Sequence, residues 1–239
     1  MIENLAWDSD FFGLNVGRYK GKTLRKSQTK KFLKEAEKRK FDCVYVFLDP
    51  SDYESVAEAG ENKFFLSDIR SVYELPKMEL NKSKGSLLTH SVLSSEDGRE
   101  KEEVIKMSKK LSSASRFYFD PIFRNKAKEI YAIWAEKIIN NKNGAVILNS
   151  RKGRIVGFTG CELDKGVGEI VLVYVGEKFR GQGFGEEVVK NGVEWLIKNK
   201  AKKIMVKTQV RNVAANRLYQ KAGFRVAENN LIYHVWRKK

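Results

Sequence analysis

The amino-acid sequence predicts a mixed α/β fold made of two modules. Short apolar runs typical of strands alternate with amphipathic stretches typical of helices. A polar, turn-rich stretch over residues 77–98 then separates an N-terminal part from a C-terminal part. We place the boundary near residue 84, which gives an N-terminal α/β module over 1–84 and a larger module over 85–239.

The N-terminal module contains four predicted elements in alternating order. Spacing of apolar residues predicts a helix over 30–40, and the run CVYVFL predicts a buried strand over 43–48. A capped helix over 51–60 ends at Gly60, and a second strand covers 69–75. This alternation is the pattern of an α/β layer unit.

The second module begins with two predicted helices, over 100–111 and 125–141, followed by three strands. One face of the second helix carries an apolar stripe that we expect to be core: Ala127, Ile130, Tyr131, Trp134 and Ile138. The strands cover 145–150, 154–163 and 169–175, and the turn sequences between them predict an antiparallel meander.

The remainder of this module alternates between helices and strands. We expect a helix over 186–200, a strand over 203–210, a helix over 212–223 and a final pair of strands that ends at Trp236. The inward positions of the first of these helices are Val188, Val189, Val193, Leu196 and Ile197.

Composition narrows the range of partners. Lys and Arg total 46 against 30 Asp and Glu, a formal net charge of +16, so the surface attracts anions. The basic residues are scattered, which favours a solvated cationic surface over a dedicated nucleic-acid face. Cys43 and Cys161 lie far apart, and His90 and His234 are isolated, so we expect neither a metal site nor a disulfide framework.

The N-terminus lacks the pattern of a signal peptide, and no apolar run reaches the length of a membrane span. Together with free thiols this predicts a cytoplasmic protein that does not enter membranes.

The stretch KFRGQGFGEE, residues 178–187, places three glycines on alternate positions just before a predicted helix. Gly181, Gly183 and Gly185 allow positive φ and close backbone approach, and Arg180 adds a charge. Amides at a helix N-terminus bind anions, so a pyrophosphate is the ligand that we expect this loop to bind. The spacing matches neither a P-loop nor a dinucleotide-binding fingerprint, and a purely structural turn is the alternative.

A second stretch, QVRNVAANRLYQKAGF, begins where the strand over 203–210 ends. Asn212 can cap the helix that follows, and Tyr219 lies two turns further along, on the same side. The alternative for Tyr219 is a core residue with its hydroxyl at the rim.

Together these residues resemble the acetyl-CoA motifs of the GNAT N-acetyltransferases: R/Q-x-x-G-x-G/A from Arg180, and N-x-x-A-x-x-x-Y-x-x-x-G-F from Asn212. The resemblance covers roughly residues 145–236. It implies a GNAT fold, with a central twisted mixed sheet flanked by helices, and acetyl-CoA as co-substrate without a metal.

The resemblance also assigns roles. Backbone amides of the loop would hold the CoA pyrophosphate, and the strand over 169–175 would splay from its neighbour and pair with the pantetheine arm. Tyr219 would be the catalytic group that protonates the departing thiolate. The cofactor-binding set is Leu172, Val173, Tyr174, Val175, Arg180, Gly181, Gln182, Gly183, Phe184, Gly185, Asn212, Ala215 and Tyr219.

A narrower resemblance involves residues 5–18, LAWDSDFFGLNVGR, and 115–123, SRFYFDPIF, with the helix after them. They are similar to signatures of the TDP-fucosamine acetyltransferase group, which acetylates the amine of a dTDP-linked 4-amino-4,6-dideoxyhexose. This implies that the N-terminal module is a smaller, partial GNAT-like unit on the acceptor side. The alternative for WDSDFFG is a buried aromatic turn, with Trp7, Phe11 and Phe12 in the core and Asp8 or Ser9 as a cap.

Four residues of SRFYFD are candidates for binding the acceptor. Arg116 suits a phosphate or sugar carboxyl, Phe117 and Tyr118 can stack on a base or sugar face, and Asp120 can bind hydroxyls or steer an ammonium. No general base is assigned. Glu162 and Glu169 are the nearest carboxylates along the chain, but both lie beside turns, where a solvated hairpin end is the simpler interpretation.

Three functions remain open from the sequence. The first is acetyl transfer from acetyl-CoA to a nucleotide-linked amino-deoxy sugar in bacterial surface polysaccharide biosynthesis. The second is the same chemistry on a protein, a polyamine or another small amine, which the charge of +16 disfavours. The third is a basic module that binds nucleic acid or membrane and keeps a degenerate fold. An exposed edge at 231–236 would allow a homodimer.

Overall fold

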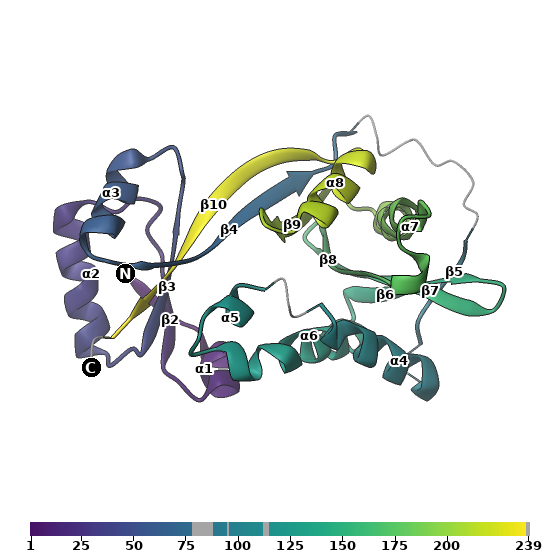
Figure 1. The fold of residues 1–239 in the computed structure, drawn as a ribbon, viewed down its shortest axis with the longest axis horizontal. Coiled ribbons are helices and arrows are strands. Elements are labelled where there is room, and N and C mark those ends of the chain that lie inside the picture. The colour runs from purple at the N-terminus through teal and green to yellow at the C-terminus, as the bar shows by residue number, and fades with distance from the viewer. Residues whose placement is uncertain (78–87, 95, 112–114, 238–239) are drawn as a thin grey trace. The chain divides into compact units, whose positions relative to one another are not determined.

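A computed structural model of the chain describes residues 1–77, 88–94, 96–111 and 115–237 (Figure 1). The strands are β1 (Ile2–Asn4), β2 (Val16–Tyr19), β3 (Cys43–Leu48), β4 (Phe65–Glu74), β5 (Thr89–Val92), β6 (Gly144–Arg151), β7 (Arg154–Asp164), β8 (Val167–Val175), β9 (Lys203–Gln209) and β10 (Arg225–Trp236). The helices are α1 (Ala6–Phe12), α2 (Lys26–Lys38), α3 (Tyr53–Glu61), α4 (Gly98–Lys109), α5 (Arg116–Phe119), α6 (Arg124–Ile139), α7 (Phe184–Lys198) and α8 (Val213–Lys221), with a 3₁₀ turn η3 (Glu177–Phe179).

The fold is mixed α/β, as predicted, and the strands form one mixed sheet in the order β1-β2-β3-β10-β4-β9-β8-β7-β6-β5. Two compact units divide the chain. Unit 1 comprises Met1–Arg70, Phe119–Phe123 and Asn229–Lys239, and unit 2 comprises Ser71–Tyr118 and Arg124–Glu228. The units are interleaved in sequence because β4 and β10 each contribute to both, whereas the predicted boundary is a single position; residue 84 lies outside the described residues.

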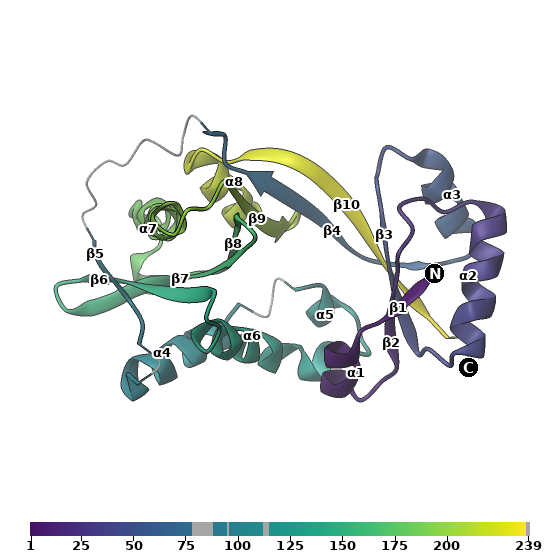
Figure 2. The same cartoon turned by 180° about the vertical axis from the view of Figure 1, so that it is seen from behind.

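Unit 1 is a small sheet with helices α2 and α3 on one face (Figure 2). Strand β3 pairs parallel with β2 and antiparallel with β10. Its alternate residues Val44, Val46 and Leu48 point into the core beneath the helices, as the pleat requires. Asp52 caps α3 by accepting from the Ser55 amide, so the predicted capped helix is confirmed.

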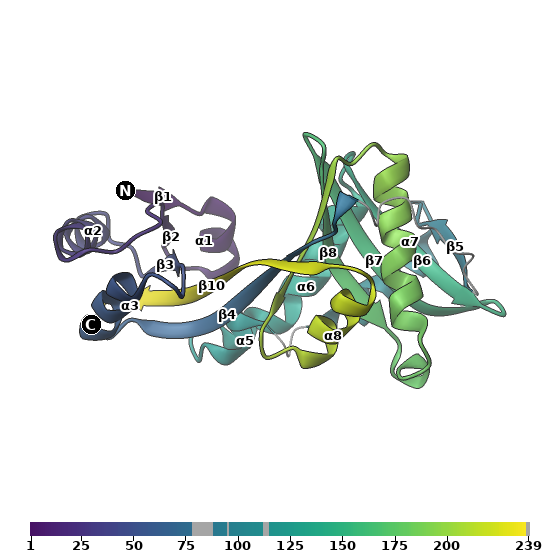
Figure 3. The same cartoon turned by 90° about the horizontal axis from the view of Figure 1, so that it is seen from above.

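Unit 2 contains the predicted meander, with β6, β7 and β8 antiparallel and β9 parallel to β8. Helix α7 crosses one face of these strands (Figure 3), and the core on that side includes Val189, Val193 and Leu196. Helices α4 and α6 pack on the opposite face through Val104, Ala135 and other residues. The unit therefore has a sheet between two helical layers.

The predicted final pair of strands is wrong, because β10 is one strand of 12 residues. The polar residues 228–230 lie within this strand, and the backbone continues through them. Strand β10 lies between β3 and β4, and residues 231–236 all pair with β3. They are therefore not a sheet edge, and they offer no exposed strand for pairing with a second subunit.

The short N-terminal elements β1, α1 and β2 were not predicted as such. WDSDFFG forms helix α1, whose Phe12 is buried and packs on Phe123 with ring centroids 4.2 Å apart. Ser9 does not cap the helix: its hydroxyl donates to the Leu5 carbonyl and accepts from the Val16 amide. Three or four residues per strand are too few for a clear alternation pattern.

Buried polar contacts fix α7 against the meander. The Thr159 hydroxyl donates to the Val188 carbonyl at 2.6 Å, and the Asn191 amide donates to Asn149 Oδ1 at 2.6 Å. Gly192 permits this approach, since a Cβ there would lie 2.5 Å from Thr159 Cγ2. Paired polar groups in a core are costly to disturb, so the position of α7 is strongly specified.

We expect Gly192→Ala to destabilise the protein by about 1–3 kcal/mol, because the added methyl overpacks the contact with Thr159. Thr159→Ser removes the clashing methyl and keeps the hydroxyl, so the double variant should recover part of the loss. Gly60→Ala, on α3 with open space around it, is the matched control and should stabilise by up to about 1 kcal/mol. Denaturant unfolding measures all three, and additive effects at positions 159 and 192 would contradict the contact.

Candidate functional site

The site begins at a break in the pairing of β8. The register between β8 and β9 runs from Val167 to Ile170, and the described part of β8 continues to Val175 without further paired residues on that side. On its other side β8 stays paired with β7 as far as Val175. Backbone groups beyond Ile170 therefore face a gap in the ladder, which is where an extended ligand can pair.

A β-bulge at Val171 accounts for the break. On β7, Gly160 pairs with Leu172 and the next residue, Cys161, pairs with Ile170, so Val171 is the extra residue. In a regular strand Ile170 and Leu172 would share a face, but Ile170 packs on the α7 side and Leu172 on the α4 and α6 side. A bulge bends its strand and increases the twist, which separates β8 from β9.

The glycine loop follows directly, as η3 and the N-terminus of α7. Gly181 and Gly183 have φ of 76° and 86°, a conformation that L side chains rarely adopt. Gly183 is the N-cap of α7, with no side chain to satisfy the first amides of the helix. Arg180 is exposed and its Nε donates to the Val175 carbonyl at 3.0 Å, which ties the loop to the end of β8.

Gly185 has a different role from the other two glycines. Its φ is not positive, and a Cβ would lie 3.2 Å from Leu218 Cδ1 on α8. A glycine at this position therefore permits close packing of α7 and α8. Phe184 is buried and Gln182 donates to the Lys178 carbonyl, so their side chains stabilise the loop while its backbone is left to bind an anion.

The turn between β9 and α8 contains Asn212 and Ala215. Asn212 caps α8, as predicted: its Oδ1 accepts from the Ala215 amide at 3.2 Å. Asn216, which sequence reasoning missed, donates to three carbonyls of the turn, those of Gln209, Val210 and Asn212. Its Oδ1 accepts from the Tyr73 hydroxyl at 2.7 Å. The sequence offers no signal for this contact, because 143 residues separate the two partners.

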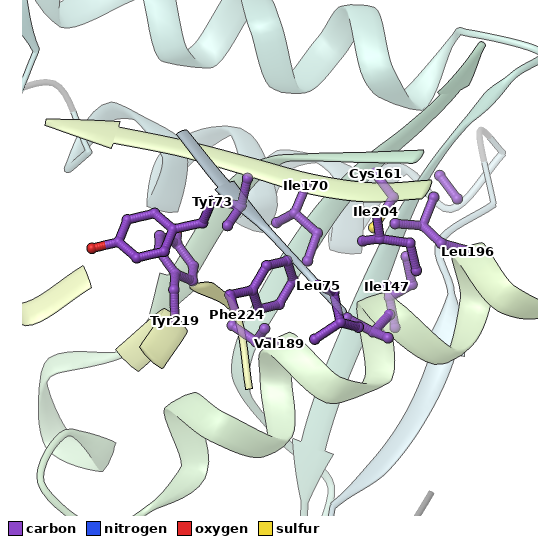
Figure 4. Packing of buried hydrophobic residues seen from close by; sticks show 13 residues of the cluster. Tyr73, Leu75, Ile147, Cys161, Ile170, Val189, Leu196, Ile204, Tyr219 and Phe224 are labelled. Carbon is purple, nitrogen blue, oxygen red and sulfur yellow. The ribbon is translucent and has the colours of Figure 1, made fainter. Parts of the chain in front are cut away.

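Tyr219 lies in the core between Tyr73 and Phe224 (Figure 4), with ring centroids 5.9 and 6.1 Å away. Its side chain is 6% exposed. Burial raises the pKa of Tyr219, and Tyr131 and Tyr73 add to the increase. The phenol is therefore held in its neutral form, the form that can donate a proton.

The four acceptor candidates are divided between the two compact units. Arg116, Phe117 and Tyr118 belong to unit 2, and Asp120 belongs to unit 1. Phe117 is buried against Trp134, and the Arg116 guanidinium lies 4.4 Å from the Phe117 ring. Phe117 is thus a core residue here, while Arg116 and Tyr118 are partly exposed.

Asp120 is 1% exposed, and its carboxylate is occupied within unit 1. Oδ2 lies 2.6 Å from His234 Nδ1 and accepts from the Trp236 indole at 3.1 Å, and Oδ1 accepts from the Ile122 amide. Burial raises the pKa of Asp120, but the His234 contact and the other bonds outweigh it and hold the pKa below its usual value. This environment favours a structural role. The sequence offers no signal for the contact with His234, because 114 residues separate the two partners.

Each of the two carboxylates considered for the general base already has a partner in the structure. Glu169 pairs with Lys207 at 2.7 Å, and Glu162 accepts from Asn141 at 3.1 Å. The described residues contain no group of three or more His, Cys, Asp or Glu side chains that could hold a metal ion. Within the same residues, no helix is long and apolar enough to cross a membrane.

A cavity of ≈ 640 Å³ lies in unit 1, between α2, the end of α3 and the ends of β3 and β10. Its lining includes Leu33, Phe41, Phe64 and Trp236. None of the site residues predicted from the sequence lines it.

Similarity to known proteins agrees with this geometry. The sequence pattern of the Acetyltransferase (GNAT) family matches residues 110–224. Spore coat polysaccharide biosynthesis protein SpsD of Bacillus subtilis (strain 168) is 27% identical over 139 residues, 56% of this chain and 47% of SpsD. Mycothiol acetyltransferase of Mycobacterium avium (strain 104) is 33% identical over 97 residues, 36% of this chain and 31% of that protein. The chain thus spans less than half the length of either relative.

Compared with solved structures, the fold is similar over nearly the whole chain. A GCN5-related N-acetyltransferase from Sphaerobacter thermophilus superposes with a TM-score of 0.64 at 11% identity, covering 98% of this chain and 75% of that one. A conserved protein of unknown function from Staphylococcus epidermidis ATCC 12228 gives a TM-score of 0.65 at 13% identity, covering 94% and 85%. The chain carries an acetyltransferase domain of the GNAT family.

Proposed function

We propose that the protein transfers acetyl from acetyl-CoA to the amino group of a nucleotide-linked amino-deoxy sugar. The observation that carries the acetyl-CoA part is the juxtaposition of the β8 bulge with the glycine loop, which the Arg180 contact to the Val175 carbonyl joins. The unpaired backbone over 172–175 suits the amides of a pantetheine arm, and the loop amides suit a pyrophosphate.

The proposed reaction needs little from the protein beyond positioning and one proton. A neutral amine attacks the thioester carbonyl carbon, a C–N bond forms, the C–S bond breaks, and the amine loses a proton to solvent. Tyr219 gives its phenolic proton to the departing thiolate and regains one from water. Asn212 accepts from the Ala215 amide and so caps α8, the helix that carries Tyr219, and strand amides at the break polarise the carbonyl oxygen.

Two observations support a nucleotide-linked amino sugar as the acceptor. The net charge of +16 favours a dianionic nucleotide sugar over a lysine or polyamine. The SpsD relative is named for polysaccharide biosynthesis, which fits an amino sugar destined for a bacterial surface polysaccharide. We favour a dTDP-linked sugar as the acceptor and a cytoplasmic location. We expect the protein to use no metal ion and to bind neither nucleic acid nor membrane.

The test is a CoA-release assay with acetyl-CoA and a panel of acceptors: dTDP- and UDP-linked amino sugars, a lysine-rich protein and spermidine. We expect turnover with a nucleotide-linked amino sugar and background rates with the cationic acceptors. Turnover only on the protein or on spermidine would overturn the acceptor class. Failure to bind acetyl-CoA would overturn the proposal as a whole.

We expect Tyr219→Phe to lower kcat by about 10²-fold or more and to change the KM for acetyl-CoA little, since the hydroxyl acts on the thiolate during bond breaking. Tyr233→Phe is the control, because Tyr233 is also 6% exposed but lies in unit 1. Steady-state kinetics distinguish a proton donor from a packing residue. Equal losses in kcat and acetyl-CoA affinity would make Tyr219 a packing residue.

The raised pKa of Tyr219 predicts the pH dependence of turnover. Because the folded pKa lies above the ordinary value of about 10, the phenol stays protonated from neutral pH up to at least that value. We therefore expect kcat to show no decline due to Tyr219 below about pH 10. A falling limb below about pH 9 that disappears in Tyr219→Phe would contradict this.

Gly183→Ala should weaken acetyl-CoA binding by roughly tenfold, since alanine at φ of 86° costs about 1–2 kcal/mol and shifts the amides of the loop. Gly153→Ala, in the β6–β7 turn at φ of 73° and with open space around it, imposes similar strain elsewhere. Calorimetric titration with acetyl-CoA compares the two. Unchanged affinity in Gly183→Ala would remove the loop from the phosphate site.

A further inference from the structure

Two arginines of unit 1 lie against one phenylalanine ring. Arg18 on β2 and Arg70 on β4 place their guanidinium carbons 4.8 and 4.9 Å from the centroid of Phe47 on β3. Arg70 also donates to Asn230 Oδ1 on β10 at 2.7 Å. The row therefore crosses four strands that are neighbours in the sheet, β2, β3, β10 and β4.

This row lies on the sheet face opposite α2 and α3. Val46 and Leu48, on either side of Phe47, point into the core beneath those helices, so Phe47 points the other way. Further along the same face, Phe123 packs on Tyr45 and His234. Arg18 is exposed and Phe47 is half-buried, which leaves this end of the face open to a ligand.

Charge distinguishes Arg18 from other arginines of unit 1. Arg25 is paired with Asp52 and Glu54, and Arg237 with Asp42. Within the described part of the chain, no carboxylate lies within ion-pair distance of Arg18. Asp68 is the nearest acid to Arg70 along β4, and even with its charge included the row remains positive.

Stacking on a ring orients a guanidinium as well as stabilising it. A cation over an aromatic face is attracted by the ring quadrupole, and its N–H groups are left to point outward. Each guanidinium carbon lies within 5 Å of the ring centroid, so the two lie at most about 10 Å apart, comparable with the screening length at physiological salt. Both positive charges would therefore attract an anion bound at this end of the face, and guanidinium N–H groups would donate hydrogen bonds to it.

We propose that Arg18, Phe47 and Arg70 bind the diphosphate of a nucleoside diphosphate, which a nucleotide-linked sugar would present. The choice of a nucleoside diphosphate rests on the proposed function, whereas the site itself rests on the geometry of unit 1. Two phosphoryl groups match two guanidiniums, one for each. Asn230 keeps Arg70 in place by its hydrogen bond.

The test is calorimetric titration of the full chain with dTDP, without acetyl-CoA, at fixed salt. We expect Arg18→Gln and Arg70→Gln each to weaken binding about tenfold or more. Lys30→Gln, at an exposed lysine of α2 in the same unit, is the charge-matched control and should change affinity less than about threefold. Equal losses in the control and the arginine variants would show a general charge effect and overturn the site.

Two further variants separate the stack from its charge. Phe47→Leu keeps both charges but removes the ring, and we expect it to weaken dTDP binding as well. Arg18→Lys keeps the charge but removes the planar fork, and should restore little of the affinity lost in Arg18→Gln. Since Arg18 is exposed, its variants should fold normally, and thermal unfolding verifies this. Full affinity in both Phe47→Leu and Arg18→Lys would overturn the proposal.

Probe ligands identify the recognised group and keep this inference distinct from the proposed function. Pyrophosphate should compete with dTDP, and thymidine should not; thymidine binding as tightly as dTDP would overturn the site. Absence of dTDP binding by the unaltered protein would do the same. If the protein acetylates nucleotide sugars but the arginine variants bind dTDP as tightly as the unaltered protein, the proposed function stands and this site does not. If the arginine variants lose dTDP binding but the unaltered protein acetylates no nucleotide sugar, the site stands and the proposed function does not.

Discussion

The candidate site depends on the extra residue that β8 carries at Val171. Up to Ile170 the strand has partners on both sides, and beyond it only β7 remains paired. The bulge turns Leu172 and Tyr174 toward α4 and α6, so that their side chains stabilise the strand while its backbone faces the gap. A regular strand would have closed the ladder with β9 and left no backbone for a ligand.

The remaining parts of the site are fixed relative to that strand by polar contacts. Thr159 and Asn191 attach α7 to the meander, and Arg180 attaches the glycine loop to the end of β8. On the other side of the gap, Asn216 closes the β9–α8 turn and accepts from Tyr73. The amides at the helix N-terminus and the phenol of Tyr219 are thus presented by rigid elements, which is what a preorganised site requires.

The sequence predicted α7 and the β6–β8 meander well, because their patterns are clear over many residues, and it predicted β3 from its continuous apolar run. It also predicted the Asn212 cap, a local interaction with its own signature. It could not predict the Tyr73–Asn216 bond or the burial of Asp120 beside His234, since these join residues distant along the chain. The bulge at Val171 shifts the β7–β8 register by one residue, and an apolar run carries no signal for such a shift.

Amide-resolved hydrogen exchange, with and without acetyl-CoA, tests the account most directly because it reports on the backbone groups themselves. We expect acetyl-CoA to slow exchange at two stretches, residues 172–175 beyond the bulge and residues 181–185 at the start of α7. Protection confined to other segments, with these two stretches unchanged, would contradict the claim that the bulge and the loop form the acetyl-CoA site.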